Sequence, residues 1–204
     1  MFPLGMVIFP HQIVGLCVFE PRYRQMLNDV ADTQTFGTCL IARGSEVGGG
    51  DERTSVGTMM RIRGEQAMPD GKILLVAEGV SCFAVERWLD DDPYPRAVAH
   101  ERCCDDVMID PDLLRLAETS VRALRHLQSE VAADEVFAIN CEMAQDPWER
   151  SWQLCSMTPM ALLDQFKVIS LSDPNERLRL LVEICCERYG DYQRMLSVDH
   201  TPFG

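Results

Sequence analysis

The first half of the chain alternates short apolar runs with turn-forming residues, a pattern typical of β-strands. We expect one short helix, over about Pro21–Ala31, to interrupt these strands. Proline and then Asp-Gly within Met68–Lys72 predict a tight hairpin turn, and Gly44–Thr54 predicts a longer loop. The expected strands cover Met6–Phe9, Ile13–Phe19, Phe36–Ala42, Gly57–Gly64, Ile73–Glu78, Ser81–Trp88 and Ala97–Cys103.

The second half has helical periodicity, and its predicted helices begin with one repeated device. A residue that can cap a helix stands directly before a proline in Asp110-Pro111, Asp146-Pro147, Thr158-Pro159 and Asp173-Pro174. Proline is tolerated at the first helical position because its missing N–H would have no partner there. Glu149 and Glu176 follow at capping-box spacing. We therefore predict helices from these prolines, and a further helix over about Asp134–Ala144.

Two of the predicted helices carry an apolar stripe that needs a partner surface. In Pro111–Ala133 it is Leu113, Leu116, Ala117, Val121, Leu124, Leu127 and Val131, and in Pro174–Tyr189 it is Leu178, Leu181, Val182, Cys185 and Tyr189. Strands followed by a run of helices indicate an α+β protein. We place the boundary in Asp105–Pro111, which gives a β-rich subdomain, 1–107, and an α-helical subdomain, 108–204.

Composition narrows the function classes. The chain has 204 residues, of which 47% are hydrophobic, and a net charge of −13 with only two lysines, Lys72 and Lys167. This charge disfavours nucleic acid as a partner. No apolar run approaches the roughly 20 residues of a membrane span, and no secretory signal is recognisable. Nine cysteines, an odd number without a C-x-x-C pair, are consistent with a reduced, cytoplasmic chain.

The sequence contains no recognisable catalytic motif, cofactor motif or metal-ligand set. Gly71-Lys72 lacks the following Ser or Thr of a phosphate loop. The Gly48–Asp51 run predicts a hairpin loop, and Asp90–Asp92 predicts a solvated turn because calcium loops use alternate positions. The adjacent pairs Cys103-Cys104 and Cys185-Cys186 cannot chelate by themselves, and the four histidines, His11, His100, His126 and His200, are scattered. A Cys–His nucleophile pair nevertheless stays open as an alternative.

A set of ordered motifs resembles the substrate-binding N-terminal domain of Lon proteases, the LON domain. The motifs are Phe2-Pro3-Leu4, Val7–Pro10, Val18–Arg24 (VFEPRYR), Phe36-Gly37, Gly44–Asp51, Val56–Thr58, Leu74–Gly79, Asp91–Ala97 and Leu171–Leu178. The resemblance implies a PUA-like β pseudo-barrel followed by a helical bundle, and recognition of protein substrates for an ATP-dependent protease. The ATPase phosphate loop and the Ser–Lys dyad of that enzyme have no counterpart here. We therefore expect a stand-alone, non-enzymatic module without a cofactor.

The residues expected to bind a peptide are Phe19, Glu20, Arg22, Tyr23, Met59, Met68 and Tyr94. The first four stand at a strand-to-helix corner, where a purely structural role is the competing interpretation, with Glu20 receiving the first helical N–H groups and Arg22 pairing locally. Methionine suits loose recognition of apolar segments. We expect an apolar groove between the subdomains, with unfolded or degradation-prone polypeptides, or a protease or chaperone, as partner. A thiol-dependent enzyme and a PUA-like RNA-binding module are the alternatives, and the oligomeric state stays open.

Overall fold

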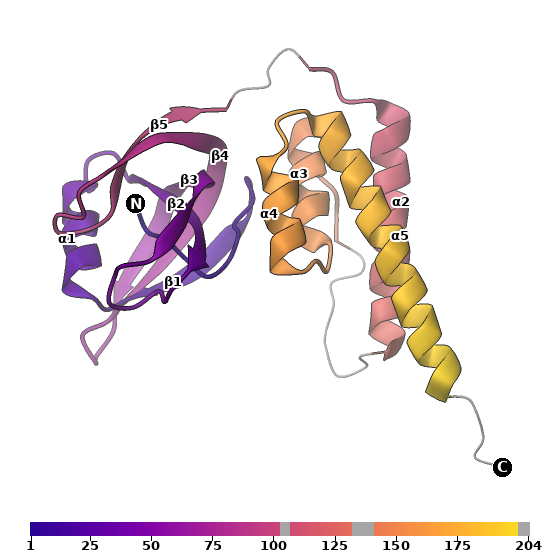
Figure 1. Ribbon diagram of the computed structural model, residues 1–204, viewed down its shortest axis with the longest axis horizontal. Coiled ribbons are helices and arrows are strands. Elements are labelled where there is room, and N and C mark those ends of the chain that lie inside the picture. The colour runs from indigo at the N-terminus through magenta and orange to yellow at the C-terminus, as the bar shows by residue number, and fades with distance from the viewer. Residues whose placement is uncertain (103–106, 132–140, 200–204) are drawn as a thin grey trace. The chain divides into compact units, whose positions relative to one another are not determined.

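The computed structural model of this protein describes residues 1–102, 107–131 and 141–199. The chain divides into two compact units, Met1–Cys103 and Cys104–Gly204. The first unit contains an antiparallel sheet and one short helix, and the second contains helices (Figure 1). This order of elements confirms the predicted α+β class, and the sheet is compatible with a PUA-like barrel that is not closed. The subdomain boundary predicted between residues 107 and 108 stays a prediction.

The sheet of the first unit has five strands in the order β1-β4-β3-β2, and β5 also pairs with β4. The strands are β1 (Ile13–Val18), β2 (Thr35–Arg43), β3 (Glu52–Ala67), β4 (Ile73–Leu89) and β5 (Arg96–Glu101), and all their pairings are antiparallel. The predicted hairpin turn joins β3 to β4, with the Met68 N–H donating to the Lys72 carbonyl. Gly71 provides the positive φ that this turn requires.

The two strands predicted over Ile73–Glu78 and Ser81–Trp88 are one continuous strand, β4. Gly79, which lies between the two predicted strands, pairs with Met60 of β3, next to a register shift in the ladder where Met59 pairs with Ser81. A β-carbon at Gly79 would lie 2.4 Å from the carbonyl oxygen of Phe9, so the glycine permits a close approach of two backbones. Prediction failed here because a glycine inside a strand looks the same in sequence as a glycine at a turn.

The predicted strand over Met6–Phe9 is wrong, since this segment has no regular pairing. Val7, Ile8 and Phe9 are all buried, which explains why the run is apolar without being a strand. Backbone pairing occurs earlier, where the Phe2 and Leu4 N–H groups donate to the carbonyls of β2. A continuous apolar run indicates burial, and burial alone does not distinguish a strand from a packed loop.

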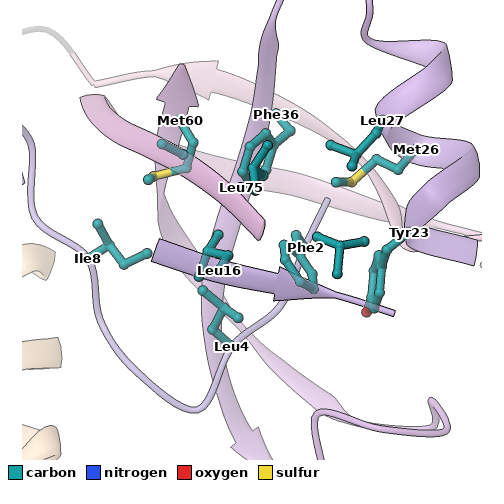
Figure 2. Packing of buried hydrophobic residues seen from close by; sticks show 12 residues of the cluster. Phe2, Leu4, Ile8, Leu16, Tyr23, Met26, Leu27, Phe36, Met60 and Leu75 are labelled. Carbon is teal, nitrogen blue, oxygen red and sulfur yellow. The ribbon is translucent and has the colours of Figure 1, made fainter. Parts of the chain in front are cut away.

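Side chains from the N-terminal segment, from the sheet and from helix α1 (Pro21–Asp29) make up the core of the first unit (Figure 2). Met26, Met60 and Leu75 are completely buried in it. Two buried threonine hydroxyls donate hydrogen bonds to the N-terminal segment. Thr38 donates to the Phe2 carbonyl at 2.9 Å, and Thr58 donates to the Ile8 carbonyl. The N-terminal segment is therefore part of the core.

The helices of the second unit are α2 (Pro111–Val131), α3 (Pro147–Met157), α4 (Leu162–Ser170) and α5 (Pro174–Asp199). Three of the four predicted proline starts are confirmed, and Asp146 accepts a hydrogen bond from the Glu149 N–H at 2.8 Å. Helices α2 and α5 lie side by side (Figure 1). Of the α2 stripe, Leu116 is 52% exposed, whereas Leu114 is buried in its place.

The fourth proline start is wrong, because α4 begins at Leu162 and not at Pro159. Thr158 instead ends α3, and its hydroxyl donates to the Leu154 carbonyl at 2.8 Å. A residue before proline is pushed out of the helical region, so this dipeptide terminates one helix rather than starting the next. The helix predicted over Asp134–Ala144 falls largely on residues outside the described ranges, as do Cys103 and Cys104.

The second unit contains a fully buried arginine, Arg177. The Arg177 guanidinium lies 3.5 Å from the ring centroid of Trp152 and 5.2 Å from that of Trp148. It also donates to the Ser151 hydroxyl at 3.1 Å. The cation is thus accommodated by aromatic faces and a hydroxyl, which serves packing within this unit.

Candidate functional site

The corner between β1 and α1 holds four of the predicted site residues, and its local structure follows from Pro21 at the start of the helix. Glu20 has extended backbone angles, but its side chain makes no capping hydrogen bond, so the expected contact with the first helical N–H groups is wrong. Its carboxylate instead lies 3.2 Å from the Arg22 guanidinium, which confirms the expected local pairing of Arg22. The corner is therefore held by the Glu20–Arg22 ion pair and by backbone hydrogen bonds to the Glu20 carbonyl, without a side-chain cap.

Tyr23 of α1 is buried and belongs to the wall of the core. Its ring centroid lies 4.3 Å from that of Phe2, and the Arg22 guanidinium covers the ring at 4.5 Å. Burial raises the pKa of Tyr23 to about 12. The phenol therefore stays protonated at neutral pH, and its contribution to a binding surface is a fixed aromatic wall.

The loop between β2 and β3 folds against this corner. Arg22 donates to the Glu46 carbonyl at 3.3 Å, and the Gly48 N–H donates to the Glu20 carboxylate at 3.4 Å. Gly48, Gly49 and Gly50 all have positive φ, a conformation that other residues rarely adopt. The glycine run thus lets the loop turn back toward α1, bringing Glu46 and Val47 beside Phe19.

These segments line an open pocket of about 250 Å³, which we call the edge pocket. Three of its residues are exposed apolar side chains, Met6 at 43%, Phe19 at 47% and Val47 at 55%. Figure 2 shows Phe2, Leu4, Leu16 and Tyr23, which line it, as neighbours. The full lining is Phe2, Leu4, Met6, Gly15–Glu20, Tyr23, Glu46 and Val47. Most of this surface is apolar, so the pocket is suited to an apolar group.

The structure brings only some of the predicted site residues together. Phe19, Glu20 and Tyr23 line the edge pocket, and Arg22 contacts two of them. Met59, Met68 and Tyr94 do not line it. Met68 is exposed in the β3–β4 turn, and the Tyr94 hydroxyl donates to Asp29 at 2.7 Å while its ring packs against the core. Whether any of these seven residues binds a peptide stays a prediction.

Sequence reasoning missed the residues that complete the pocket, namely Met6 and Val47 with Phe2 and Leu4. A usable signal existed for Val47, since it is an isolated apolar residue in a loop of glycine and charged residues. No such signal existed for the N-terminal residues, because their apolar character is equally explained by burial. Only the fold shows that this segment runs beside β1.

An ion-pair cluster fixes the base of the same loop. The Arg53 guanidinium contacts the Asp51 carboxylate at 2.6 Å and the Asp91 carboxylate at 2.8 Å. The hydrogen bonds from Arg53 hold the pKa of Asp91 below its usual value. Asp91 was expected to be solvated in a turn, and its pairing with Arg53 corrects that expectation in part, since its side chain stays 36% exposed.

Across residues 1–102, 107–131 and 141–199, no group of three or more His, Cys, Asp or Glu side chains is placed to hold a metal ion. Nor does any helix in those ranges have the length and apolar character needed to cross a bilayer. Burial raises the thiol pKa of Cys39 and Cys185 to about 12 and that of Cys155 to about 11. These three thiols are therefore protonated at neutral pH and are poor nucleophiles.

The fold is that of a known class of domain. It is similar to a Lon N-terminal domain protein from Xanthomonas campestris, with a TM-score of 0.60 and 24% identity over 89% of this chain and 95% of that one. It is also similar to the N-terminal domain of Mycobacterium avium complex Lon protease, with a TM-score of 0.62 and 14% identity over 91% and 97% of the two chains.

Sequence comparison agrees with the fold. Residues 1–187 match the family model of the ATP-dependent protease La (LON) substrate-binding domain, and the chain belongs to this family. The Lon protease of Escherichia coli K12 is 23% identical over 181 residues, which cover 86% of this chain and 23% of that protein. The chain thus spans about a quarter of the length of the curated relatives it matches.

Proposed function

We propose that this chain is a non-enzymatic module that binds unfolded or degradation-prone polypeptides, or a protease or chaperone that handles them. The observation that carries the proposal is the edge pocket, an open apolar hollow whose exposed side chains include Phe19 and Val47. Exposed apolar side chains gathered at a concave site are typical of interaction surfaces. Membership in a family described as substrate-binding supports the same interpretation.

The proposal includes the absence of catalysis and a cytoplasmic setting. The family match concerns a substrate-binding domain and not the ATPase or protease parts of Lon. The raised pKa of Cys39, Cys155 and Cys185 argues against these three as the nucleophile of a thiol enzyme, because a nucleophilic cysteine needs a lowered pKa. A net charge of −13 weakens the RNA-binding alternative. The groove predicted between the two subdomains stays a prediction.

The test is binding of a permanently unfolded chain, reduced and carboxymethylated α-lactalbumin, measured by fluorescence anisotropy. We expect Phe19→Ser to weaken binding by roughly tenfold, since truncating an aromatic contact at the centre of an interface costs more than about 1 kcal/mol. The matched control is Leu163→Ser on α4, where an apolar side chain is 65% exposed in the other unit. Equal affinities of the two variants would show that the binding surface does not include Phe19. If the unmodified protein does not bind the unfolded chain, the proposal is refuted.

A further inference from the structure

One edge of β1 is unpaired in the sheet. Strand β1 pairs with β4, and none of the other described strands pairs with its opposite edge. The Gly79 N–H donates to the Gln12 carbonyl at 2.9 Å, which places Gln12 at a position directed toward β4. Because backbone groups alternate in direction along an antiparallel strand, Ile13, Gly15 and Cys17 direct their N–H and C=O groups toward the open edge. This edge presents a row of donors and acceptors that an extended backbone could complete.

The open edge faces the N-terminal segment across the edge pocket. Gly15, Cys17 and Phe19 line the pocket on one side, and Leu4 and Met6 line it on the other. The Leu4 N–H donates to β2 and the Leu4 carbonyl accepts from β2, so this segment is hydrogen-bonded on its far side. The pocket is therefore lined by β1, at one end of the strand order, and by a segment that pairs with β2, at the other end.

The dimensions and surroundings of this gap favour one type of occupant. A volume of about 250 Å³ is smaller than the ~300–1,000 Å³ of typical small-molecule sites, and it leaves room for a bulky apolar side chain. The outward sheet face beside the edge is also apolar, with Ile13 65% exposed, Leu74 39% and Val76 38%. An added strand would extend this face while placing alternate side chains in the pocket.

The negative charge of the pocket favours certain residues beside the inserted apolar side chain of a bound segment. Glu20 and Glu46 are the charged side chains that line it, and no Lys or Arg is among the lining residues. Arg22 neutralises part of the charge of Glu20. The Glu46 carboxylate accepts a hydrogen bond from the Gly5 N–H, which holds it at the pocket. A segment carrying Lys or Arg next to its apolar residue would complement these carboxylates.

We propose that an extended polypeptide segment binds along the open edge of β1 as an additional strand, inserting a bulky apolar side chain flanked by Lys or Arg into the edge pocket. This proposal rests on the proposed function, since it specifies how the same module holds a polypeptide. Strand addition gives affinity through backbone hydrogen bonds, which are independent of sequence, and selectivity through the pocket. Such a mode suits a module that recognises many unfolded chains by a short apolar and basic motif.

The experiment uses a capped nine-residue peptide with a central phenylalanine, flanking lysines and valine or threonine elsewhere. Two further versions carry N-methyl groups on alternate residues, one on the odd and one on the even positions. In an added strand, only the odd or only the even N–H groups of the peptide can face β1. We therefore expect the version methylated on those groups to bind at least about tenfold more weakly, and the other version to bind like the parent. A version with glutamates in place of the lysines should also bind more weakly.

Amide hydrogen exchange on the protein supplies an independent measurement. The parent peptide should slow exchange at Gly15 and Cys17 and leave Val14 and Leu16, which already face β4, unchanged. Equal binding of both N-methylated versions, or no change at Gly15 and Cys17, would overturn strand addition. If exchange slows with rising protein concentration and not with added peptide, and sedimentation shows a dimer, the edge of β1 binds a second copy of the chain. That result would also overturn the proposal.

The two proposals can fail separately. If unfolded α-lactalbumin binds but the designed peptide does not, or binds without dependence on N-methyl position, strand addition is wrong and the polypeptide-binding function stands. If neither probe binds, the proposed function is wrong, and strand addition fails with it.

Discussion

Replacing Thr38 by valine should destabilise the first unit by removing one of the hydrogen bonds that hold the segment forming one wall of the edge pocket. Thr38 is 2% exposed, and its hydroxyl donates to the Phe2 carbonyl at 2.9 Å inside the core. Valine has the same shape but cannot donate, so the substitution removes one hydrogen bond without creating a cavity. The Phe2 carbonyl would then be buried without this donor, which costs about 1–3 kcal/mol.

Two effects reduce the cost of burying the Phe2 carbonyl without its donor. The added methyl group is favourable in an apolar site, which offsets part of the loss, at about 0.8 kcal/mol for one buried carbon. The Phe2 N–H still donates to the Gly37 carbonyl, so the segment keeps one of its attachments. We therefore expect Thr38→Val to lower the free energy of unfolding by about 1–2 kcal/mol.

Urea denaturation measures this change, with Thr33→Val as the matched control. The Thr33 hydroxyl donates to the Val30 carbonyl at 3.3 Å, but this residue is exposed, so water replaces the lost partner. The control should stay within about 0.5 kcal/mol of the unmodified protein. Hydrogen exchange at the Leu4 amide should accelerate in Thr38→Val, because that amide pairs with β2 beside the lost contact. An unchanged free energy of unfolding in Thr38→Val would refute the role assigned to this hydroxyl.

Two further substitutions test other parts of the first unit. Gly79→Ala should lower the free energy of unfolding by about 1–3 kcal/mol, because the new carbon would overlap the Phe9 carbonyl. The matched control, Gly64→Ala, has open space around the new carbon and should cost little. Similar urea midpoints for the two variants would contradict this reasoning. Asp91→Asn should cost less than about 1 kcal/mol at pH 7, because the pair with Arg53 is partly exposed. The folded-state pKa of Asp91 lies below its unfolded value of 3.8, so its stabilisation is complete above that pH and is lost as pH falls through the folded-state pKa. The difference between Asp91→Asn and the unmodified protein should therefore shrink in urea titrations below pH 3.8, and a constant difference would show that Asp91 titrates normally.

Local patterns predicted most of the elements because their causes are local. Aspartate followed by proline marked the starts of α2, α3 and α5, since capping and the missing proline N–H act within one turn. Thr158-Pro159 failed because a residue before proline also ends helices, and the choice depends on what precedes it. The predicted division of β4 into two strands at Gly79 was wrong for a related reason, since the close approach of Phe9 to this glycine is a tertiary contact.

The candidate site divides in the same way. The sequence by itself determined the α+β order, the family resemblance and the corner that holds Phe19, Glu20 and Tyr23, because these depend on residue order and short-range periodicity. Only the tertiary structure decided that Met6 and Val47 meet this corner, that Met59, Met68 and Tyr94 do not, and that one edge of β1 is open. The physical reason is that strand neighbours and pocket walls arise from contacts between residues distant in the chain. Such contacts are set by how the whole sheet closes, or in this protein stays open, and no short stretch of sequence carries that information.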